Sequence, residues 1–266
     1  MAKDFDNKVI WITGASSGIG EALAIAISGM NARLILSARR VSELERVKEN
    51  CAQNSDVSIL PLDLAEADSL ESKTREAEGI FGHIDILINN GGISQRDKVI
   101  NTSMEVDRRI MEVDYFGSIA LSKYVLPEMV KRKSGQHVVI SSAVGIVSTP
   151  LRAGYSASKH ALHGWYDALR SEHHDDNIKV TLVCPGYVNT NISYSALMGD
   201  GKEQNLLDEA QQNGLTPVYF SKKAIRAILK EKQEVYIGGF LENLAIYVKR
   251  FIPGLFSIMI RKIKST

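Results

Sequence analysis

Short apolar runs alternate along the chain with segments whose apolar residues recur every three or four positions. These two patterns predict buried β-strands and amphipathic α-helices, respectively. The longest helical patterns cover residues 104–133 and 152–175. The predicted strands are residues 9–12, 34–37, 57–60, 84–88, 137–141, 180–184 and 234–237. Because strands and helices alternate, the sequence predicts a parallel sheet with helices on both faces.

The chain has the features of a single folded domain. At 266 residues it has the size of one α/β domain with a substantial core. No linker rich in proline, glycine or serine divides it. The least regular stretch, residues 191–217, is polar and contains Gly199, Gly201 and Gly214. This stretch fits either a flexible lid over a substrate pocket or an ordinary surface loop.

Charge and cysteine content exclude some classes of function. The formal net charge is +1, so no nucleic-acid-binding surface is evident. Cys184 ends an apolar strand and is expected in the core, while Cys51 lies in a helical stretch. Neither cysteine belongs to a metal-binding spacing or implies a disulfide. We interpret His160 and His163 as solvated helix residues and assign no metal.

A glycine-rich turn follows the first predicted strand. The segment Thr13-Gly-Ala-Ser-Ser-Gly-Ile-Gly20 lies between that strand and a helical pattern that includes Leu23. Glycines at such a turn let backbone N–H groups approach a phosphate, and the helix N-terminus adds favourable partial charge. A tight turn without a ligand is the alternative. The strand before it and the helix after it favour phosphate binding.

Tyr155 and Lys159 are four residues apart in a predicted helix, which places the phenol and the ammonium on one face. A phenol in water ionises near about pH 10, and a neighbouring cation favours its ionised form. The pair is therefore a candidate acid/base device. Ser142 ends the apolar run that begins at His137, and a strand ending there would present its hydroxyl toward the same place.

Two further motifs follow predicted strands. Asn89-Asn-Gly-Gly92 comes after residues 84–88, and Pro185-Gly-Tyr-Val-Asn-Thr190 comes after residues 180–184. Together with the glycine turn and the Ser142, Tyr155 and Lys159 set, these motifs resemble the short-chain dehydrogenase/reductase family over residues 13–190. The resemblance implies a Rossmann-type doubly wound parallel β-sheet in a single domain. Ligands of such folds bind at the carboxyl ends of the strands, where every motif is expected.

The end of the second predicted strand indicates which dinucleotide would bind. Folds that prefer NAD place a carboxylate there for the adenosine ribose, whereas this chain has Arg39 and Arg40. A guanidinium can hold a 2′-phosphate through two hydrogen bonds. Both arginines could instead be solvated residues at a helix start, but the helix dipole disfavours cations there. We therefore predict NADP (NADPH) as the cofactor, with NAD as the weaker alternative.

The resemblance also implies further cofactor contacts. Asp63 and Leu64 would border the adenine, Asn90 the neighbouring ribose, and Val188 and Thr190 the nicotinamide amide. Asp63 could equally cap the helix that follows it, since aspartate is a favoured N-cap residue. The complete predicted cofactor-binding set is Gly14, Ser16, Ser17, Gly18, Ile19, Gly20, Arg39, Arg40, Asp63, Leu64, Asn90, Tyr155, Lys159, Val188 and Thr190.

The same resemblance implies a mechanism. Tyr155 would donate a proton to the oxygen of a carbonyl substrate, Lys159 would assist it and bind the nicotinamide ribose, and Ser142 would hydrogen-bond the substrate oxygen. We expect an NADP-dependent oxidoreductase that acts on a secondary alcohol or ketone, with a hydrophobic or lipid-like substrate. The alternative is a non-catalytic dinucleotide-binding redox sensor or scaffold. A homodimer or homotetramer is expected by resemblance only.

One catalytic position departs from the family pattern. The family carries an asparagine in an Asn-x-x-Gly context, linked to the lysine through water, whereas this chain has Asp114-Tyr-Phe-Gly117. A carboxylate there would stabilise Lys159 as a cation. We expect activity to persist with an altered pH profile. Gly91 stands where the family has alanine, and we expect that change to be steric with little chemical consequence.

The C-terminal extension, residues 240–266, differs in character from the predicted dehydrogenase domain at 1–239. Its apolar residues recur at helical spacing between basic ones, and Pro253-Gly254 interrupts the run. The apolar stretch between Arg250 and Arg261 is shorter than the roughly 20 residues that span a bilayer. The segment could lie on a membrane surface through residues 240–264, or pack against the substrate loop or a partner subunit. The apolar residues are Leu244, Val248, Phe251, Leu255 and Ile258 or Met259; the basic residues are Lys249, Arg250, Arg261, Lys262 and Lys264.

The N-terminal segment, residues 1–8, contains no apolar signal-peptide core. We therefore expect a cytoplasmic protein, with peripheral membrane association if the C-terminal segment lies on a membrane surface.

Overall fold

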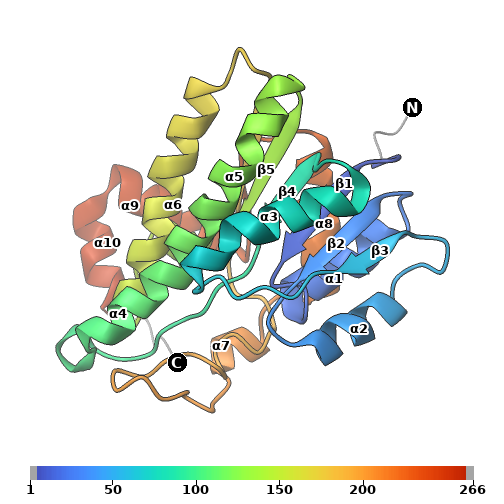
Figure 1. Cartoon of the computed structure of the whole chain (residues 1–266). Helices are drawn as coiled ribbons and strands as arrows, with labels where there is room; N and C mark the ends of the chain where they lie inside the picture. Colours follow the sequence, from blue (N-terminus) through green and yellow to red (C-terminus); the bar gives the residue numbers. More distant parts are fainter. Residues whose placement is uncertain (1–4, 262–266) are drawn as a thin grey trace.

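A seven-stranded parallel sheet forms the centre of the molecule, as the sequence predicts (Figure 1). The computed structural model describes residues 5–261. All seven predicted strands are present, and their ends differ from the prediction by no more than two residues. The strands are β1 (Val9–Thr13), β2 (Arg33–Ser37), β3 (Val57–Ile59), β4 (Ile86–Asn89), β5 (Gly135–Ile140), β6 (Ile178–Pro185) and β7 (Glu234–Ile237).

Helices cover both faces of the sheet, because successive side chains of each buried strand point to opposite faces. Ile10 and Ile12 of β1 pack toward one layer, formed by α1, α2 and α8, whereas Val9 and Trp11 pack toward the other, formed by α3, α5 and α6. The six layer helices are α1 (Gly18–Ser28), α2 (Val41–Glu49), α3 (Ala67–Phe81), α5 (Gly117–Lys131), α6 (Ala153–Glu172) and α8 (Pro217–Leu229).

The helical pattern predicted over residues 104–133 is divided by a π-helical turn. Helix α4 (Met104–Met111) leads into the turn η2 (Glu112–Phe116), and α5 begins at Gly117. A π-turn often marks a functional site, because it re-aims the side chains within a helix. Here it buries Asp114 completely.

The strands are ordered β3-β2-β1-β4-β5-β6-β7 across the sheet. From β1 the chain adds strands toward one edge, and from β4 it adds them toward the other edge, while all strands stay parallel. The register pairs Ile12 with Ile88, so both strands end side by side. The segments that follow them therefore meet at the point where this fold class binds its ligands. The fold is the doubly wound parallel sheet that the sequence predicts.

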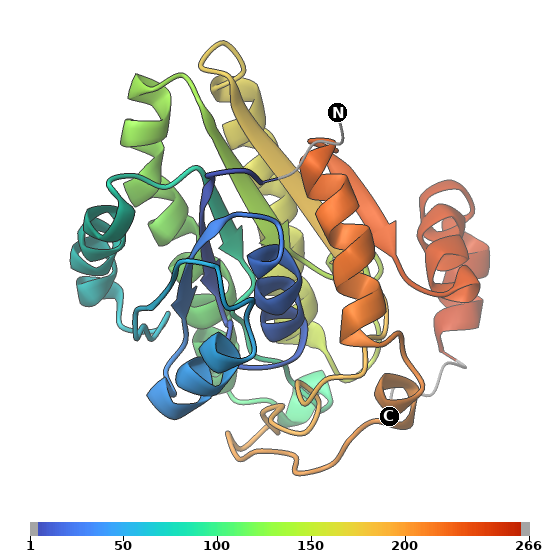
Figure 2. The same cartoon turned by 90° about the vertical axis from the view of Figure 1, so that its right-hand side faces the viewer.

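Two C-terminal helices lie outside both layers, beyond the β7 edge of the sheet (Figures 1 and 2). They are α9 (Phe240–Phe251) and α10 (Pro253–Ile260), and they pack against each other. The break between the two helices falls just before Pro253, where the sequence predicts an interruption. Lys262 and Lys264 lie outside the described residues. No helix within residues 5–261 has the length and apolar content needed to cross a bilayer.

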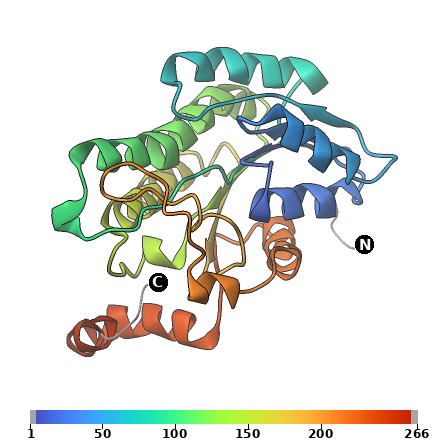
Figure 3. The same cartoon turned by 90° about the horizontal axis from the view of Figure 1, so that it is seen from below.

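The stretch 191–217 is irregular, as predicted, and contains the short helix α7 (Glu209–Gln212). Seen from below, it lies between α4 and the C-terminal helices (Figure 3). Cys184 is buried in β6, as predicted, and Cys51 is buried just beyond the end of α2 rather than within a helix. Both thiols are free.

Candidate active site

A cavity of about 1090 Å³ opens at the carboxyl ends of the strands. The glycine turn, the ends of β2 and β4, the start of α6 and the irregular stretch all contribute to its wall. Nearly all predicted site residues line it, and only Gly20 and Asp114 lie outside the lining. The structure therefore brings together residues that are spread from 13 to 190 in the sequence.

The glycine turn requires glycine for its backbone conformation and for close contact. Gly14 has a φ of +62° and Gly18 a φ of +59°, in the left-handed region that side chains disfavour. A Cβ on Gly20 would overlap the carbonyl oxygen of Gly14. The turn leads directly into α1, so that the helix N-terminus and its free N–H groups face the cavity.

Asn90 holds the glycine turn in place from the neighbouring strand. Its side-chain nitrogen donates hydrogen bonds to the carbonyl oxygens of Thr13 (3.0 Å) and Gly14 (3.1 Å). The Thr13 hydroxyl in turn accepts from the backbone nitrogens of Asn90 and Gly91. Asn90 thus lines the cavity as predicted and also shapes the turn that would hold a phosphate.

Arg39 and Arg40 line the cavity at the end of β2 with exposed side chains. Within residues 5–261, neither guanidinium forms a hydrogen bond or an ion pair. Arg46, one turn along α2, is instead fixed by Glu21 at 2.7 Å and Glu43 at 2.9 Å. Two cations at the cavity rim are therefore available to an anionic ligand, and the third stabilises the packing of α1 against α2.

Asp63 lines the cavity but does not cap the following helix, so that alternative was wrong. The N-cap of α3 is Glu66, three residues further on. The Asp63 carboxylate accepts a hydrogen bond from the backbone nitrogen of Ala65 at 3.0 Å, which closes a local turn. The sequence could not distinguish a turn from a helix cap at Asp63, because aspartate is favoured both in turns and at N-caps.

Tyr155 and Lys159 lie one turn apart on α6 and both face the cavity. The Lys159 ammonium lies 5.5 Å from the centre of the Tyr155 ring. Ser142 is in the turn after β5 rather than in the strand, since the strand ends at Ile140. Its hydroxyl accepts a hydrogen bond from the backbone nitrogen of Val144 and lines the same cavity.

Asp114 forms a buried ion pair behind the cavity wall, with 3.6 Å between its Oδ2 and the Nζ of Lys159. The carboxylate also accepts hydrogen bonds from the Ile93 nitrogen (2.8 Å) and the Ser158 hydroxyl (3.3 Å). Burial raises the pKa of Asp114, and the Lys159 charge partly offsets that effect. Burial, the largest single effect, would lower the pKa of Lys159, but the charges of Asp114 and Tyr155 and the hydrogen bond to Asp114 together raise it. Lys159 is therefore held as a cation.

Gly92 permits this pair to approach the end of β4. A Cβ at that position would lie 3.1 Å from Asp114 Oδ1 and 3.4 Å from Lys159 Nζ. At Gly91, a Cβ would lie 2.6 Å from the end of the flexible Leu64 side chain and in ordinary contact, at 3.4 Å, with Gly14 N and Thr13 Oγ1. An alanine at position 91 would require that side chain to move, so the difference from the family pattern is steric.

The sequence did not reveal a buried cluster of Arg96, Arg152 and Asp208 beside the cavity. Asp208 Oδ2 lies 2.7 Å from a guanidinium nitrogen of Arg96 and 3.1 Å from one of Arg152, and all three side chains are almost fully buried. Burial, the largest single effect, would raise the pKa of Asp208, but Arg96, Gln204 and Arg152 together lower it. Burial and the Arg152 charge lower the pKa of Arg96. Because Asp208 belongs to the irregular stretch, the cluster fastens that stretch to the start of α6 and to the loop after β4.

Helix α9 is also fastened to the cavity. Glu242 accepts hydrogen bonds from the backbone nitrogens of Tyr187 (3.1 Å) and Gly239, and Lys249 donates to the carbonyl oxygen of Ile146. The C-terminal segment therefore packs beside the cavity, against the segments that follow β5 and β6. Its cavity-lining residues are Leu241, Glu242, Ala245 and Ile260.

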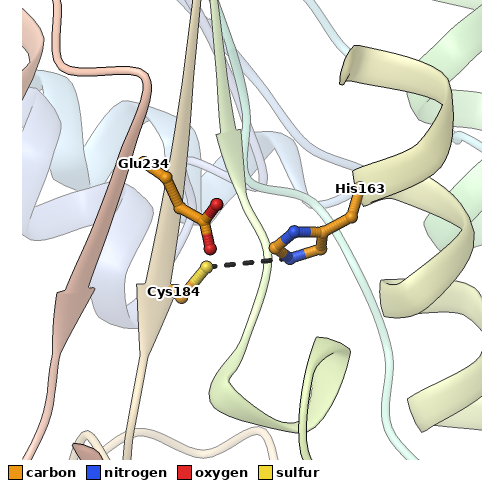
Figure 4. Close-up of side chains that lie close together, drawn as sticks. All are labelled: His163, Cys184 and Glu234. Carbon is orange, nitrogen blue, oxygen red and sulfur yellow. Dashed lines mark hydrogen bonds between the residues drawn. The ribbon is translucent and has the colours of Figure 1, made fainter. Parts of the chain in front are cut away.

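His163 is not the solvated helix residue that the sequence suggested. Its Nε2 lies 3.0 Å from the Ser141 hydroxyl and 3.7 Å from the Cys184 sulfur (Figure 4). Burial lowers the pKa of His163, which favours the neutral ring, and raises that of Cys184. His163, Cys184 and Glu234 each place a donor atom within 4.8 Å of the other two, so these three side chains could hold a metal ion. No sequence motif indicates this group, because its members come from three separate elements.

Known proteins resemble this chain over most of its length. The sequence model of the family described as short chain dehydrogenase matches residues 8–198. The dehydrogenase/reductase SDR family protein 7-like of Anopheles gambiae is 41% identical over 98% of this chain and 84% of its own length. The dehydrogenase/reductase SDR family member 7 of Homo sapiens is 41% identical over 94% of this chain and 76% of its own length.

Solved structures show the same fold. An alcohol dehydrogenase from Thermococcus sibiricus, complexed with 5-hydroxy-NADP, has a TM-score of 0.75 and 26% identity over 88% of this chain and 97% of its own. A short chain dehydrogenase/reductase from Burkholderia phymatum, in complex with NAD, has a TM-score of 0.82 and 21% identity over 99% of both chains.

Proposed function

Because this chain belongs to the short-chain dehydrogenase/reductase family and is an NAD(P)-dependent oxidoreductase, we propose that it transfers a hydride between NADP(H) and a secondary alcohol or ketone. The observation that carries the proposal is that Ser142, Tyr155 and Lys159 line the same cavity as the glycine turn. A turn suited to bind phosphate and a group suited to transfer a proton thus share one cavity. The substrate we infer is hydrophobic or lipid-like.

The residues at the glycine turn fit a dinucleotide. The left-handed glycines and the start of α1 form a cradle that a side chain would fill. Arg39 and Arg40 line the same cavity, and a guanidinium binds a phosphate well, which supports NADP rather than NAD. The Thermococcus sibiricus alcohol dehydrogenase, whose structure contains 5-hydroxy-NADP, adds support. When bound, the dinucleotide supplies or accepts the hydride.

The chain's own residues handle the proton. In reduction, the Tyr155 hydroxyl donates its proton to the carbonyl oxygen of the substrate, and in oxidation the phenolate takes a proton from the alcohol. Lys159, held as a cation by Asp114, stabilises the phenolate electrostatically. The Ser142 hydroxyl donates a hydrogen bond to the substrate oxygen, which orients it and stabilises developing negative charge.

The lining of the cavity beyond the catalytic residues supports an apolar substrate. Apolar side chains from the η3 turn (Ala143–Gly145) and its flank, the irregular stretch and the C-terminal helices converge there. Apolar surface favours a substrate with little to gain from hydrogen bonding outside its reacting group. These side chains are Val144, Val147, Ile192, Leu197, Leu241 and Ile260.

Assembly into a homodimer or homotetramer also remains a proposal. Phe116, the last residue of η2, is 48% exposed, and Tyr124, in the middle of α5, is 38% exposed. Exposed aromatic side chains on one helix are typical of subunit interfaces. The expected cytoplasmic location stays a prediction from the sequence.

A substrate screen tests the function. Wild-type protein is incubated with NADPH and a panel of apolar and polar ketones, and NADPH consumption is followed by absorbance. We expect turnover that falls by about 100-fold or more in Tyr155→Phe, but is unchanged in Tyr219→Phe, which removes an exposed hydroxyl from α8. Tight NADPH binding without turnover on any ketone would favour the redox-sensor alternative.

A further inference from the structure

The outward faces of α9 and α10 carry an unusually dense set of exposed apolar side chains. On α9, Phe240, Leu244, Tyr247 and Phe251 recur at intervals of three or four residues and so share one face, and Phe251 is 76% exposed. On α10, the exposed apolar residues are Leu255, Ile258 and Met259. Exposed apolar surface that is contiguous rather than scattered marks an interaction site. We name the face formed by these seven residues the C-terminal apolar face.

The charged residues of α9 and α10 after Asn243 are all basic. Between Asn243 and Arg261 the chain contains Lys249, Arg250 and Arg261 but no aspartate or glutamate. Arg250 and Arg261 are exposed. The single carboxylate of α9, Glu242, points to the cavity side, where it binds backbone nitrogens. An apolar face with basic residues is complementary to an anionic lipid surface.

The opposite side of the same helices is part of the active site. Leu241, Ala245 and Ile260 line the cavity, while Phe251 and Leu255 do not. Figures 2 and 3 show α9 and α10 as a separate unit along one side of the molecule. The interaction surface and the substrate cavity are thus formed by one helix pair.

We propose that the C-terminal apolar face docks on the surface of an anionic lipid bilayer, with α9 and α10 lying in the plane of the headgroups. Neither helix is long enough to cross the membrane, so the contact is peripheral. A second copy of the chain fits less well. A symmetric pair would bring the basic residues of both copies together with no carboxylate on this face to neutralise them.

The docking places the cavity beside a reservoir of apolar molecules. If the protein is the oxidoreductase proposed above, a lipid-like ketone or alcohol enters the cavity from the bilayer past Leu241 and Ile260. This second step rests on the proposed function, whereas the docking itself does not.

Vesicle sedimentation tests the docking directly. The full-length protein is mixed with vesicles of phosphatidylcholine alone, or of phosphatidylcholine with phosphatidylserine, and the bound fraction is measured after centrifugation. We expect binding to the phosphatidylserine vesicles that weakens in high salt. The double variant Phe251→Glu with Leu255→Glu should bind more than about tenfold more weakly, because two apolar side chains no longer enter the lipid.

The matched control is the double variant Ile25→Glu with Val218→Glu. It removes two exposed apolar residues and adds the same charge, but on α1 and α8. We expect it to lose only the electrostatic part of the binding, a smaller effect than that of the α9–α10 variant. Wild-type protein that stays in the supernatant with both vesicle types overturns the proposal. Equal weakening in both variants, or a dimer that only the α9–α10 variant dissociates, also overturns it.

The delivery step has its own readout. Turnover of a vesicle-dissolved ketone should fall at least in proportion to the lost binding in the α9–α10 variant, whereas turnover of a water-soluble ketone should not change. Intact vesicle binding with no turnover on any ketone would refute the proposed function and leave the docking standing. Equal turnover of the vesicle-dissolved ketone by wild type and variant would refute the delivery step.

Discussion

The ammonium of Lys159 lies 3.6 Å from the carboxylate of Asp114, and both side chains are buried. The family pattern has a neutral amide at position 114, so this chain adds a negative charge behind Tyr155, the proposed proton donor. A buried cation beside a fixed carboxylate is less free to give up a proton. The ion pair therefore favours an electrostatic role for Lys159 over a proton-shuttling one.

Asp114→Asn should change the pH dependence of turnover. Without the carboxylate, burial lowers the pKa of Lys159, so the cation is lost at a lower pH. We expect the alkaline limb of kcat to move down by about one to three pH units. The measurement is kcat against pH, with Asp167→Asn, an exposed carboxylate on α6, as the control. Identical profiles for wild type and Asp114→Asn would dispose of this role.

Arg39→Ala and Arg40→Ala, each made alone, should weaken the binding of NADPH more than the binding of NADH. A charge-assisted hydrogen bond to a phosphate contributes about 1.5–3 kcal/mol, so the KM for NADPH should rise by about tenfold or more. The KM for NADH, which lacks the 2′-phosphate, should hardly change. Lys48→Ala, which removes an exposed cation further along α2, serves as the control. A parallel rise in both KM values would show that the arginines do not select the cofactor.

Asp208→Asn should loosen the irregular stretch 191–217. The substitution keeps the shape of the side chain but removes the charge that pairs with Arg96 and Arg152. Breaking a buried ion pair in this way costs about 3–5 kcal/mol. We expect faster proteolysis within 191–217 and a KM for substrate that rises more than kcat falls. Asp200→Asn, an exposed position in the same stretch, should have little effect on either.

His137 should make the protein sensitive to acid. The ring is fully buried in β5, and neither nitrogen has a hydrogen-bond partner within the described residues. Burial lowers the pKa of His137 from 6.5 to about 3. Below pH 6.5 the unfolded chain takes up a proton that the folded chain excludes. The free energy of unfolding should therefore fall as the pH drops toward 3, by up to about 1.4 kcal/mol per pH unit from this group.

Denaturant unfolding of His137→Leu at several pH values checks this. The variant should lose that part of the acid destabilisation, so its advantage over the wild type should grow as the pH falls from 6.5. His174→Leu, at an exposed position after α6, should keep the pH dependence of the wild type. A constant difference between His137→Leu and wild type across this range would show that the ring takes up a proton as readily in the folded state as in the unfolded chain.

Parts of the fold and site were predictable because their signals are local. The strands were recognisable from short apolar runs, and their alternation with helices required a parallel sheet. Gly14 and Gly18 were recognisable because their backbone conformation disfavours side chains. Tyr155 and Lys159 were recognisable because a helix places residues four apart on one face.

Features that depend on packing between distant segments were missed. The pairing of Asp208 with Arg96 joins residues 112 positions apart in the sequence. Both lie in irregular segments, where no periodicity indicates which side is buried. His163 was taken for a solvated residue because its partners, Ser141 and Cys184, come from the ends of two other strands.

The sequence by itself determined the order of the elements, the glycine turn and the candidate catalytic side chains, because backbone sterics and helical or strand periodicity act over a few residues. Only the tertiary structure decided how the irregular stretch is fastened, and that Asp114 reaches Lys159 through a π-turn. It also decided that α9 and α10 line the cavity with one side and expose an apolar face with the other. Those outcomes depend on which surfaces meet once the whole chain is packed, and neighbouring residues along the chain carry no record of such contacts.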